Sequence, residues 1–271
     1  MEVFLTAAIV ILIFMTALFV VSVFIQRNDI ADIAWGTGIL IVGVVGYWHY
    51  STVNPSSESV LPTILIVLYA LWGLRLTYRI GKRNLSHNDE DPRYKRWRES
   101  WGAWFYPRSY LQVYLLQGLL MIVVGSPLLI VGATGAGMTT VSPLVYLGLV
   151  VWLIGYYFEV VGDYQLDQFI ARKKAGQTDQ KIMTEGLWRY TRHPNYFGEV
   201  TMWWGIWLMV ATLPLGWVAL ISPVMITFLI LKVSGVPLLE EQFAGEPEWE
   251  AYTQKTSRFF PMPPRDLESI K

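Results

Sequence analysis

Long runs of apolar residues, separated by short polar segments, make up most of the chain. Seven such runs occur, near residues 3–25, 33–50, 60–78, 110–132, 143–161, 196–213 and 215–232. A helix of about 20 apolar residues crosses a bilayer. The first run has no basic residue before it and no small-residue cleavage site, so we expect a span and not a signal peptide. The pattern predicts an all-α, polytopic membrane protein with seven transmembrane helices.

The basic residues fall only in alternate connecting segments. Residues 50–59, 133–142 and 211–216 contain no Lys or Arg, whereas 75–108 contains nine of the 21 and 172–192 contains six. By the positive-inside rule, this asymmetry predicts an N-terminus outside and a C-terminus in the cytoplasm, in what we expect to be a bacterial inner membrane. An anionic cytosolic ligand would meet all of the basic groups on one side.

We expect one membrane domain over 1–271, with the first four spans in 1–142 and the last three in 143–271. With 54% hydrophobic and only 15% charged residues, the composition excludes an ordinary soluble domain. The chain has no Cys, which excludes a disulfide, a thiol nucleophile and a Cys-bound metal, and its three His are scattered. We therefore expect no metal. We also expect no nucleic-acid partner and no obligate protein partner; the expected partners are membrane lipid and a small-molecule ligand.

The most concentrated chemistry lies between residues 181 and 199. Arg189, Arg192 and His193 lie within five residues, before a proline and an apolar run. This pattern predicts a helix with Asn195 as its N-cap. Because a helix N-terminus carries roughly half a positive charge, the two arginines beside it predict an anion site. The ordinary alternative is that these basic residues anchor a membrane helix at the interface.

Acidic residues inside two of the predicted spans indicate a polar ligand. Glu199 lies one turn after Asn195 on the same helix face, and an ionisable residue inside a span is costly unless it has a function. Glu159 and Asp163 share a face of the fifth span, with Arg172 and two lysines further on. Such acids can hydrogen-bond a ribose or carboxamide, and the basic residues can hold phosphate. The alternative is that the basic residues only stabilise the end of their helix.

The first half of the chain carries fewer such signals. Asp29 and Asp32 open the second span; we expect Asp29 to cap the helix and Asp32, which lies deeper, to have a functional role. Arg75 lies near the inner end of the third span, close in sequence to Tyr69 and Trp72.

The connecting segment 80–109 is both charged and rich in aromatic residues. This composition argues against a disordered linker and favours an interfacial helix and lid. We expect that helix near 93–101, lying flat on the cytoplasmic surface.

The C-terminal half resembles the steroid 5α-reductase family. The resemblance covers about 150–261 and rests on GDYQLDQF at 162–169, on KIMTEGLWRYTRHPNYFGE at 181–199 and on a spaced Tyr, Thr, Phe and Pro at 252–261. Members of that family are seven-helix membrane enzymes that use NADPH to reduce a carbon–carbon double bond conjugated to a ketone in a steroid or similar lipid. The resemblance therefore implies an NADPH-dependent oxidoreductase acting on CH–CH groups, whose lipophilic substrate enters from the bilayer.

The resemblance also implies site residues. The family's cofactor-binding positions fall on Asp163, Lys181, Asn195 and Glu199, and Glu159 stands where the family prefers Asn. With the matching arginine of the third span and the neighbouring basic and aromatic residues, the predicted cofactor-binding set is Arg75, Glu159, Asp163, Arg172, Lys181, Arg189, Arg192, His193, Asn195, Tyr196 and Glu199.

The substrate side matches the family less well. The family's carbonyl-polarising tyrosine corresponds to Trp72, and no acid clearly corresponds to its partner. The predicted catalytic residues are therefore Trp72, the neighbouring Tyr69, and Asp32 as the nearest acid.

Two other classes of protein remain open. Arg192, His193, Pro194 and Tyr196, with Glu240 and Glu241, also fit the isoprenylcysteine carboxyl methyltransferases, membrane enzymes that use S-adenosylmethionine. That ligand has no phosphate, whereas NADPH brings about four negative charges that would explain the basic residues. A lipid-binding scaffold without enzymatic activity is the third class, and it leaves Glu199 inside a span unexplained.

Overall fold

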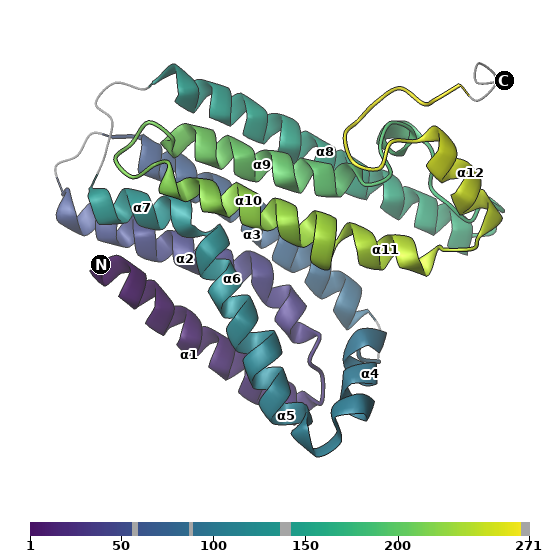
Figure 1. Cartoon of the computed structure of the whole chain (residues 1–271), viewed down its shortest axis with the longest axis horizontal. Helices are drawn as coiled ribbons and strands as arrows, with labels where there is room; N and C mark the ends of the chain where they lie inside the picture. The colour runs from purple at the N-terminus through teal and green to yellow at the C-terminus, as the bar shows by residue number, and fades with distance from the viewer. Residues whose placement is uncertain (56–58, 87–88, 136–141, 267–271) are drawn as a thin grey trace. The chain divides into compact units, whose positions relative to one another are not determined.

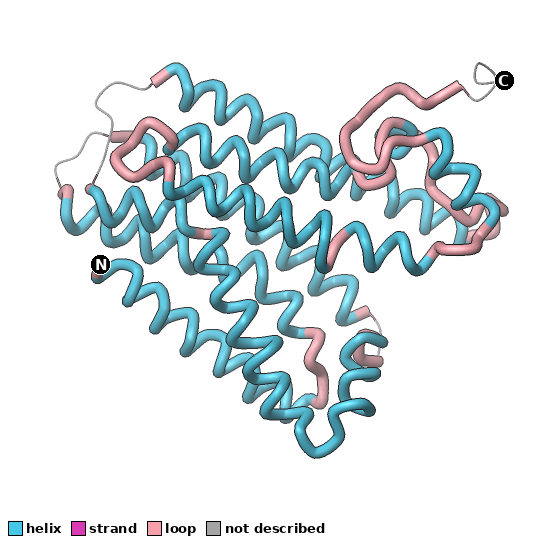
Figure 2. Tube along the Cα trace, in the orientation of Figure 1, coloured by secondary structure: helices cyan, strands magenta, loops and turns pink. Residues whose placement is uncertain are grey.

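The structure, a computed structural model, describes residues 1–55, 59–86, 89–135 and 142–266. Over these residues it contains helices and no strand, apart from an isolated bridge between Thr191 and Ser257, as Figure 2 shows. The expected all-α class is confirmed. The helices labelled in Figure 1 are α1 (Glu2–Ile25), α2 (Ile30–Val53), α3 (Leu61–Leu85), α4 (Pro92–Trp101), α5 (Phe105–Arg108), α6 (Leu116–Val124), α7 (Ser126–Thr134), α8 (Pro143–Lys174), α9 (Pro194–Val210), α10 (Ile221–Phe228), α11 (Val236–Gln242) and α12 (Pro247–Lys255).

Five helical stretches are long and apolar enough to cross a membrane, namely α1, α2, α3, α8 and Val218–Gln242. Pro92–Val124 and Ser126–Thr134, bent by 57°, make a sixth if they form one broken span. The bend falls just before Pro127, which cannot donate a helix hydrogen bond. The remaining expected span corresponds to α9, which has 17 residues. The count of seven is not confirmed, and the orientation of the termini stays a prediction.

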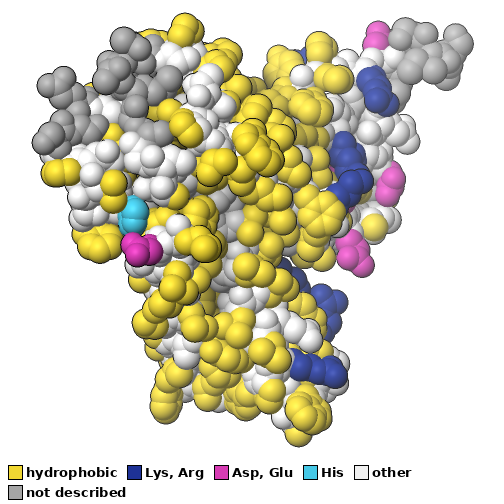
Figure 3. Space-filling view, turned by 60° about the vertical axis from the view of Figure 1, so that its left-hand side comes forward, with side chains coloured by type: hydrophobic (Ala, Val, Ile, Leu, Met, Phe, Trp, Pro, Cys, Tyr) yellow, Lys and Arg dark blue, Asp and Glu magenta, His cyan; other side chains and the backbone are white. Residues whose placement is uncertain are grey.

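The surface is that of a multi-pass membrane protein. Hydrophobic side chains cover much of the face seen in Figure 3. The most apolar window of α1 has a mean hydropathy of 3.0, but only 17% of it is buried. A soluble protein does not expose so much contiguous apolar surface, so lipid accounts for the exposed faces of these helices.

The described residues fall into two compact units. The first comprises Met1–Val145 with Val210–Ser222, and the second Tyr146–Met209 with Pro223–Lys271. In the first unit α2 packs against α1, α3 and α7. The backbones of α2 and α3 approach closely at Gly36 and Gly73, where a Cβ added at Gly73 would lie 2.6 Å from the Gly36 carbonyl oxygen.

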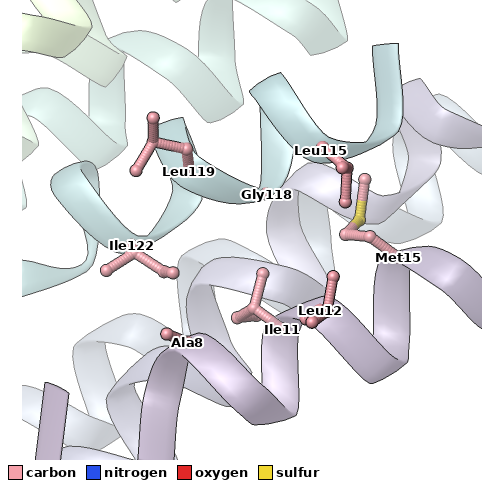
Figure 4. Close-up of a pocket in the computed structure, with 8 residues that line it drawn as sticks. All are labelled: Ala8, Ile11, Leu12, Met15, Leu115, Gly118, Leu119 and Ile122. Carbon is pink, nitrogen blue, oxygen red and sulfur yellow. The ribbon is translucent and has the colours of Figure 1, made fainter. Parts of the chain in front are cut away.

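An apolar cavity of about 220 Å³ lies between α1 and α6 in the first unit (Figure 4). It lies beside Gly118, whose missing side chain leaves α6 close to Ile11 and Met15 of α1. No residue that lines it is charged or able to do acid–base chemistry, so it belongs to the packing of the spans. The lining residues are Ala8, Ile11, Leu12, Met15, Leu115, Gly118, Leu119 and Ile122.

Paired glycines bring α8 and α9 of the second unit into close contact. A Cβ added at Gly155 would lie 2.6 Å from the Gly198 carbonyl oxygen, and one added at Gly148 would lie 2.6 Å from that of Gly205. Seven residues separate the glycines of each helix, so they lie on one face and the two helices pack along two turns. This close packing brings the acidic face of α8 against the start of α9.

Candidate functional site

The site of the second unit begins where α9 begins. The helix starts at Pro194, and the Phe197 N–H donates to the His193 carbonyl oxygen at 2.9 Å, which makes His193 the N-cap. The prediction that Asn195 is the N-cap was wrong. Proline favours the first helical position because its φ is fixed there and its missing N–H would have no helical partner. Asn195 therefore lies inside the first turn, and its side chain is directed to another partner.

That partner is Asp163 of α8. The Asn195 amide nitrogen donates to the Asp163 carboxylate at 3.1 Å, while its amide oxygen accepts from the Tyr196 N–H at 3.0 Å. The two bonds fix which way the amide points. Asp163 and Glu159 are only 4% and 3% exposed. Glu199 lies one turn after Asn195 and is half-buried. The structure thus brings Glu159, Asp163 and Asn195 to one contact between α8 and α9.

A second group of charges surrounds Glu240 of α11. One of its carboxylate oxygens accepts from Arg192 Nη2 and from His193 Nε2, both at 3.2 Å, and the other accepts from Arg258 Nη2 at 3.0 Å. The Arg192 guanidinium also lies over the Trp249 ring, 5.5 Å from its centre. We call Arg192, His193, Glu240 and Arg258 the Glu240 cluster.

The chemistry of His193 follows from its burial. Burial lowers the pKa of its imidazole, and the nearby Arg192 and Arg258 charges lower it further against the opposing effect of Glu240. The ring is therefore neutral near pH 7, and Nε2 must carry the proton that it donates to Glu240. Nδ1 is then a bare acceptor and Arg192 Nε a bare donor, and neither of these buried atoms has a hydrogen-bond partner among the residues that the structure describes. The cluster has one acceptor and one donor left for a ligand.

Residues 252–259 of the C-terminal segment hold the loop before α9 in place. Thr191 Oγ1 donates to the Phe259 carbonyl oxygen at 2.7 Å, and the Arg192 N–H donates to the Ser257 carbonyl oxygen at 2.9 Å. The Tyr252 hydroxyl donates to the Trp188 carbonyl oxygen. The motif spaced over 252–261 therefore positions the arginine and histidine of the site. Sequence reasoning missed Arg258 because no spacing linked it to the site.

The outer basic residues lie at the surface. Lys181 Nζ pairs with Glu246 at 2.9 Å, and Arg172 pairs with Glu185 at 2.9 Å. Arg189 is exposed, and Tyr196 stacks on the His193 ring at 5.7 Å. Exposed ion pairs are worth little, so Lys181 and Arg172 can exchange their acidic partners for a phosphate at small cost.

The predicted catalytic residues lie in the first unit. Asp32 accepts from the Tyr94 hydroxyl and from Arg93 Nη2, both at 2.8 Å. The Tyr69 hydroxyl donates to the Gly125 carbonyl oxygen at 3.3 Å, and Trp72 is buried. Tyr94 was not predicted, because 62 residues separate it from Asp32.

Arg75 is half-buried on α3, also in the first unit. Asp29 stands at the N-cap position of α2 as expected, but its carboxylate pairs with Arg27 at 2.7 Å and makes no cap hydrogen bond. The helix expected near 93–101 is confirmed as α4.

The chain belongs to a family described as a protein of unknown function (DUF1295), whose sequence model matches residues 18–256. It is 24% identical over 219 residues to an uncharacterised protein of Schizosaccharomyces pombe, covering 73% of this chain and 62% of that one. No solved structure matches it.

Shorter stretches match two named enzymes. The chain is 38% identical over 64 residues to 3-oxo-5-alpha-steroid 4-dehydrogenase 1 of Bos taurus, which is 24% of each chain. It is 36% identical over 69 residues to the very-long-chain enoyl-CoA reductase of Dictyostelium discoideum, covering 26% of this chain and 22% of that one. The resemblance to the steroid 5α-reductase family is confirmed. These matches span about a quarter of each enzyme, and the fission-yeast match spans less than two thirds of that relative.

Proposed function

We propose that the chain is a membrane-embedded, NADPH-dependent reductase of a carbon–carbon double bond conjugated to a ketone in a steroid-like or other lipophilic substrate. The observation that carries the proposal is the Asp163–Asn195 hydrogen bond beside buried Glu159, one turn from Glu199. A buried carboxylate and amide offer both acceptors and donors to a ribose or a carboxamide. The local matches to two reductases of lipid substrates support the same reaction class.

The residues of the second unit fit the chemistry of this cofactor. Buried His193 Nδ1 and Arg192 Nε have no hydrogen-bond partner in the described part of the chain, so the site has polar atoms that a ligand can satisfy. Asn195 and Glu199 would hold the nicotinamide end, and Asp163 with Glu159 would orient a ribose. The phosphates would be held by Arg172, Lys181, Arg189 and Arg192. When bound, NADPH supplies the hydride.

On the substrate side, reduction of an enone places negative charge on the carbonyl oxygen, and that charge needs a hydrogen-bond donor in a dry pocket. Trp72, Tyr69 and Asp32 remain the proposed groups. Tyr69 already donates to a backbone carbonyl, so its hydroxyl must change partner to serve. An ionised Asp32 carboxylate cannot donate a hydrogen bond. Its proposed role is to position a donor, such as the Tyr94 hydroxyl that it accepts from.

Glu199→Gln tests the proposal directly. The substitution removes the charge at nearly constant volume, so the protein should stay folded. We expect the NADPH affinity to fall at least tenfold, about 1.4 kcal/mol, because the carboxylate no longer accepts from the carboxamide. The measurement is the shift in melting temperature with NADPH concentration, in detergent micelles. Glu241→Gln is the control, since Glu241 is exposed on α11, and its affinity should change little. Equal NADPH affinity in wild type and Glu199→Gln would refute the role of Glu199.

One observation favours the second candidate, an S-adenosylmethionine-dependent methyltransferase of the isoprenylcysteine carboxyl methyltransferase type. Arg192 and His193 both contact Glu240, so the residues of that family's pattern meet in space. S-adenosylmethionine would leave Lys181 and Arg172 without an anionic ligand. A melting temperature that rises with S-adenosylmethionine and not with NADPH would decide for methyl transfer.

A further inference from the structure

Residues 89–108, which precede the π-helical stretch Ser109–Leu115, are fixed to the first unit along one side of α4. The Asp91 side chain caps α4 by accepting from the Arg93 N–H at 2.9 Å. Arg93 pairs with Asp32 at 2.8 Å, and Arg98 pairs with Glu90 at 3.1 Å. These contacts neutralise two of the cations of α4 and fix its rotation about its own axis.

The remaining cations of this segment are at the surface. Lys95 and Arg96 are exposed, and neither makes an ion pair with any residue that the structure describes. Arg108 is exposed and lies over the Trp101 ring, 5.9 Å from its centre. Glu99 is also exposed, one turn after Lys95, so this part of the chain carries three exposed cations and one acid, and none of the three cations has an ion-pair partner among the described residues.

Large aromatic side chains accompany these cations. Trp97 is 38% exposed and Trp104 is 67% exposed. Trp97 stacks on Trp101, with the ring centres 5.2 Å apart and the planes at 10°. Exposed tryptophans between cations suit the headgroup region of a bilayer, where the ring meets apolar chains and its N–H meets water. A surface that only faces solvent would gain nothing from them.

We propose that Lys95, Arg96, Trp97, Trp104 and Arg108 form a binding surface for anionic phospholipid headgroups, which we call the α4 surface. The candidate span α3 precedes this segment, and α4 opens Pro92–Val124, the first part of the candidate broken span, so the segment lies where that span begins. Each cation near an anionic membrane strengthens binding about fivefold. Because Arg93 and Tyr94 reach Asp32 from the same helix, bound lipid would also hold that contact in place.

The test uses the whole protein in nanodiscs of phosphatidylcholine alone or with about one third phosphatidylglycerol. Hydrogen–deuterium exchange is followed in peptides that cover 92–104. We expect exchange in this segment to be at least threefold slower with phosphatidylglycerol, and the difference to vanish in high salt because the attraction is electrostatic.

Two double variants separate charge from fold. Lys95→Gln with Arg96→Gln should abolish the difference between the lipids, whereas the charge-preserving Lys95→Arg with Arg96→Lys should keep it. Trp104→Ala should speed exchange equally in both lipids, since the ring binds the bilayer without regard to headgroup charge. Equal exchange of the wild type in the two lipids would overturn the proposal, as would an undiminished difference in the Gln variant. Faster exchange throughout 1–130 in the Lys95→Gln, Arg96→Gln variant would indicate misfolding. The wild type in high salt would then decide, because a difference between the two lipids that persists in high salt would overturn the proposal.

Discussion

Each unit contains a carboxylate held by arginines, and the two groups differ in what they leave unsatisfied. Asp32 has one arginine and one tyrosine, and that arginine, Arg93, also bonds Asp91. Glu240 has two arginines and a histidine, so its cluster has more cationic groups than acids. The first group has two carboxylates, Asp32 and Asp91, for one arginine and so carries no spare positive charge, whereas the Glu240 cluster keeps positive charge and two buried polar atoms without a hydrogen-bond partner among the described residues. The sign of the remaining charge and the unused polar atoms, more than the presence of ion pairs, distinguish the structural contact from the candidate ligand site.

The largest expected effect on stability comes from breaking the ion pair between Asp32 and Arg93. Asp32→Asn leaves Arg93 with Asp91 alone and weakens the bond from Tyr94, so we expect a loss of about 1–2 kcal/mol, or about 2–8 °C in melting temperature. Affinity for NADPH should not change. Asp179→Asn, at an exposed position of the second unit, is the control and should have no effect.

A double variant checks the cause of that loss. Adding Arg93→Gln to Asp32→Asn removes an arginine whose contact with Asp32 the first change has already broken, so the double variant should be less destabilised than the sum of the two single variants. A strictly additive loss would mean that the ion pair is not what Asp32 contributes.

The matching change in the Glu240 cluster should act on binding instead. Glu240→Gln removes the carboxylate that competes with a phosphate for Arg192 and Arg258, so NADPH should bind about fivefold more tightly, by the roughly 1 kcal/mol that one charge contributes at contact in water. The measurement is the NADPH dissociation constant from melting shifts, with inorganic phosphate as a second ligand. Weaker NADPH binding would show that Glu240 itself contacts the cofactor. The carboxylate would then be part of the ligand site and not a competitor of the phosphate.

The same comparison shows which parts of the molecule could be predicted from the sequence. The apolar runs predicted nearly every long helix because burial in lipid needs only length and hydrophobicity. The start of α9 was misplaced by two residues because Asn195 is a good cap in isolation, while Pro194 decides the local geometry. The partners of the carboxylates could not be predicted. Glu240 lies 47 residues from His193, and no local pattern records which distant side chains the helix packing brings together.

The smallest expected effect is the pH dependence that His193 adds to stability. Burial holds the pKa of its imidazole below the usual 6.5, so the unfolded chain binds its proton at a higher pH than the folded chain does. Stability from this group is fully present above about pH 6.5 and is lost as the pH falls toward the folded value. His193→Gln should therefore flatten the change in melting temperature between about pH 7 and 5.5, while lowering the melting temperature only slightly at pH 7. Both proteins keep every other titratable group, so the difference between their pH profiles isolates this residue. A wild-type profile that is no steeper than that of His193→Gln would mean that burial does not lower the pKa of the imidazole, and that the folded protein protonates His193 as readily as the unfolded chain does.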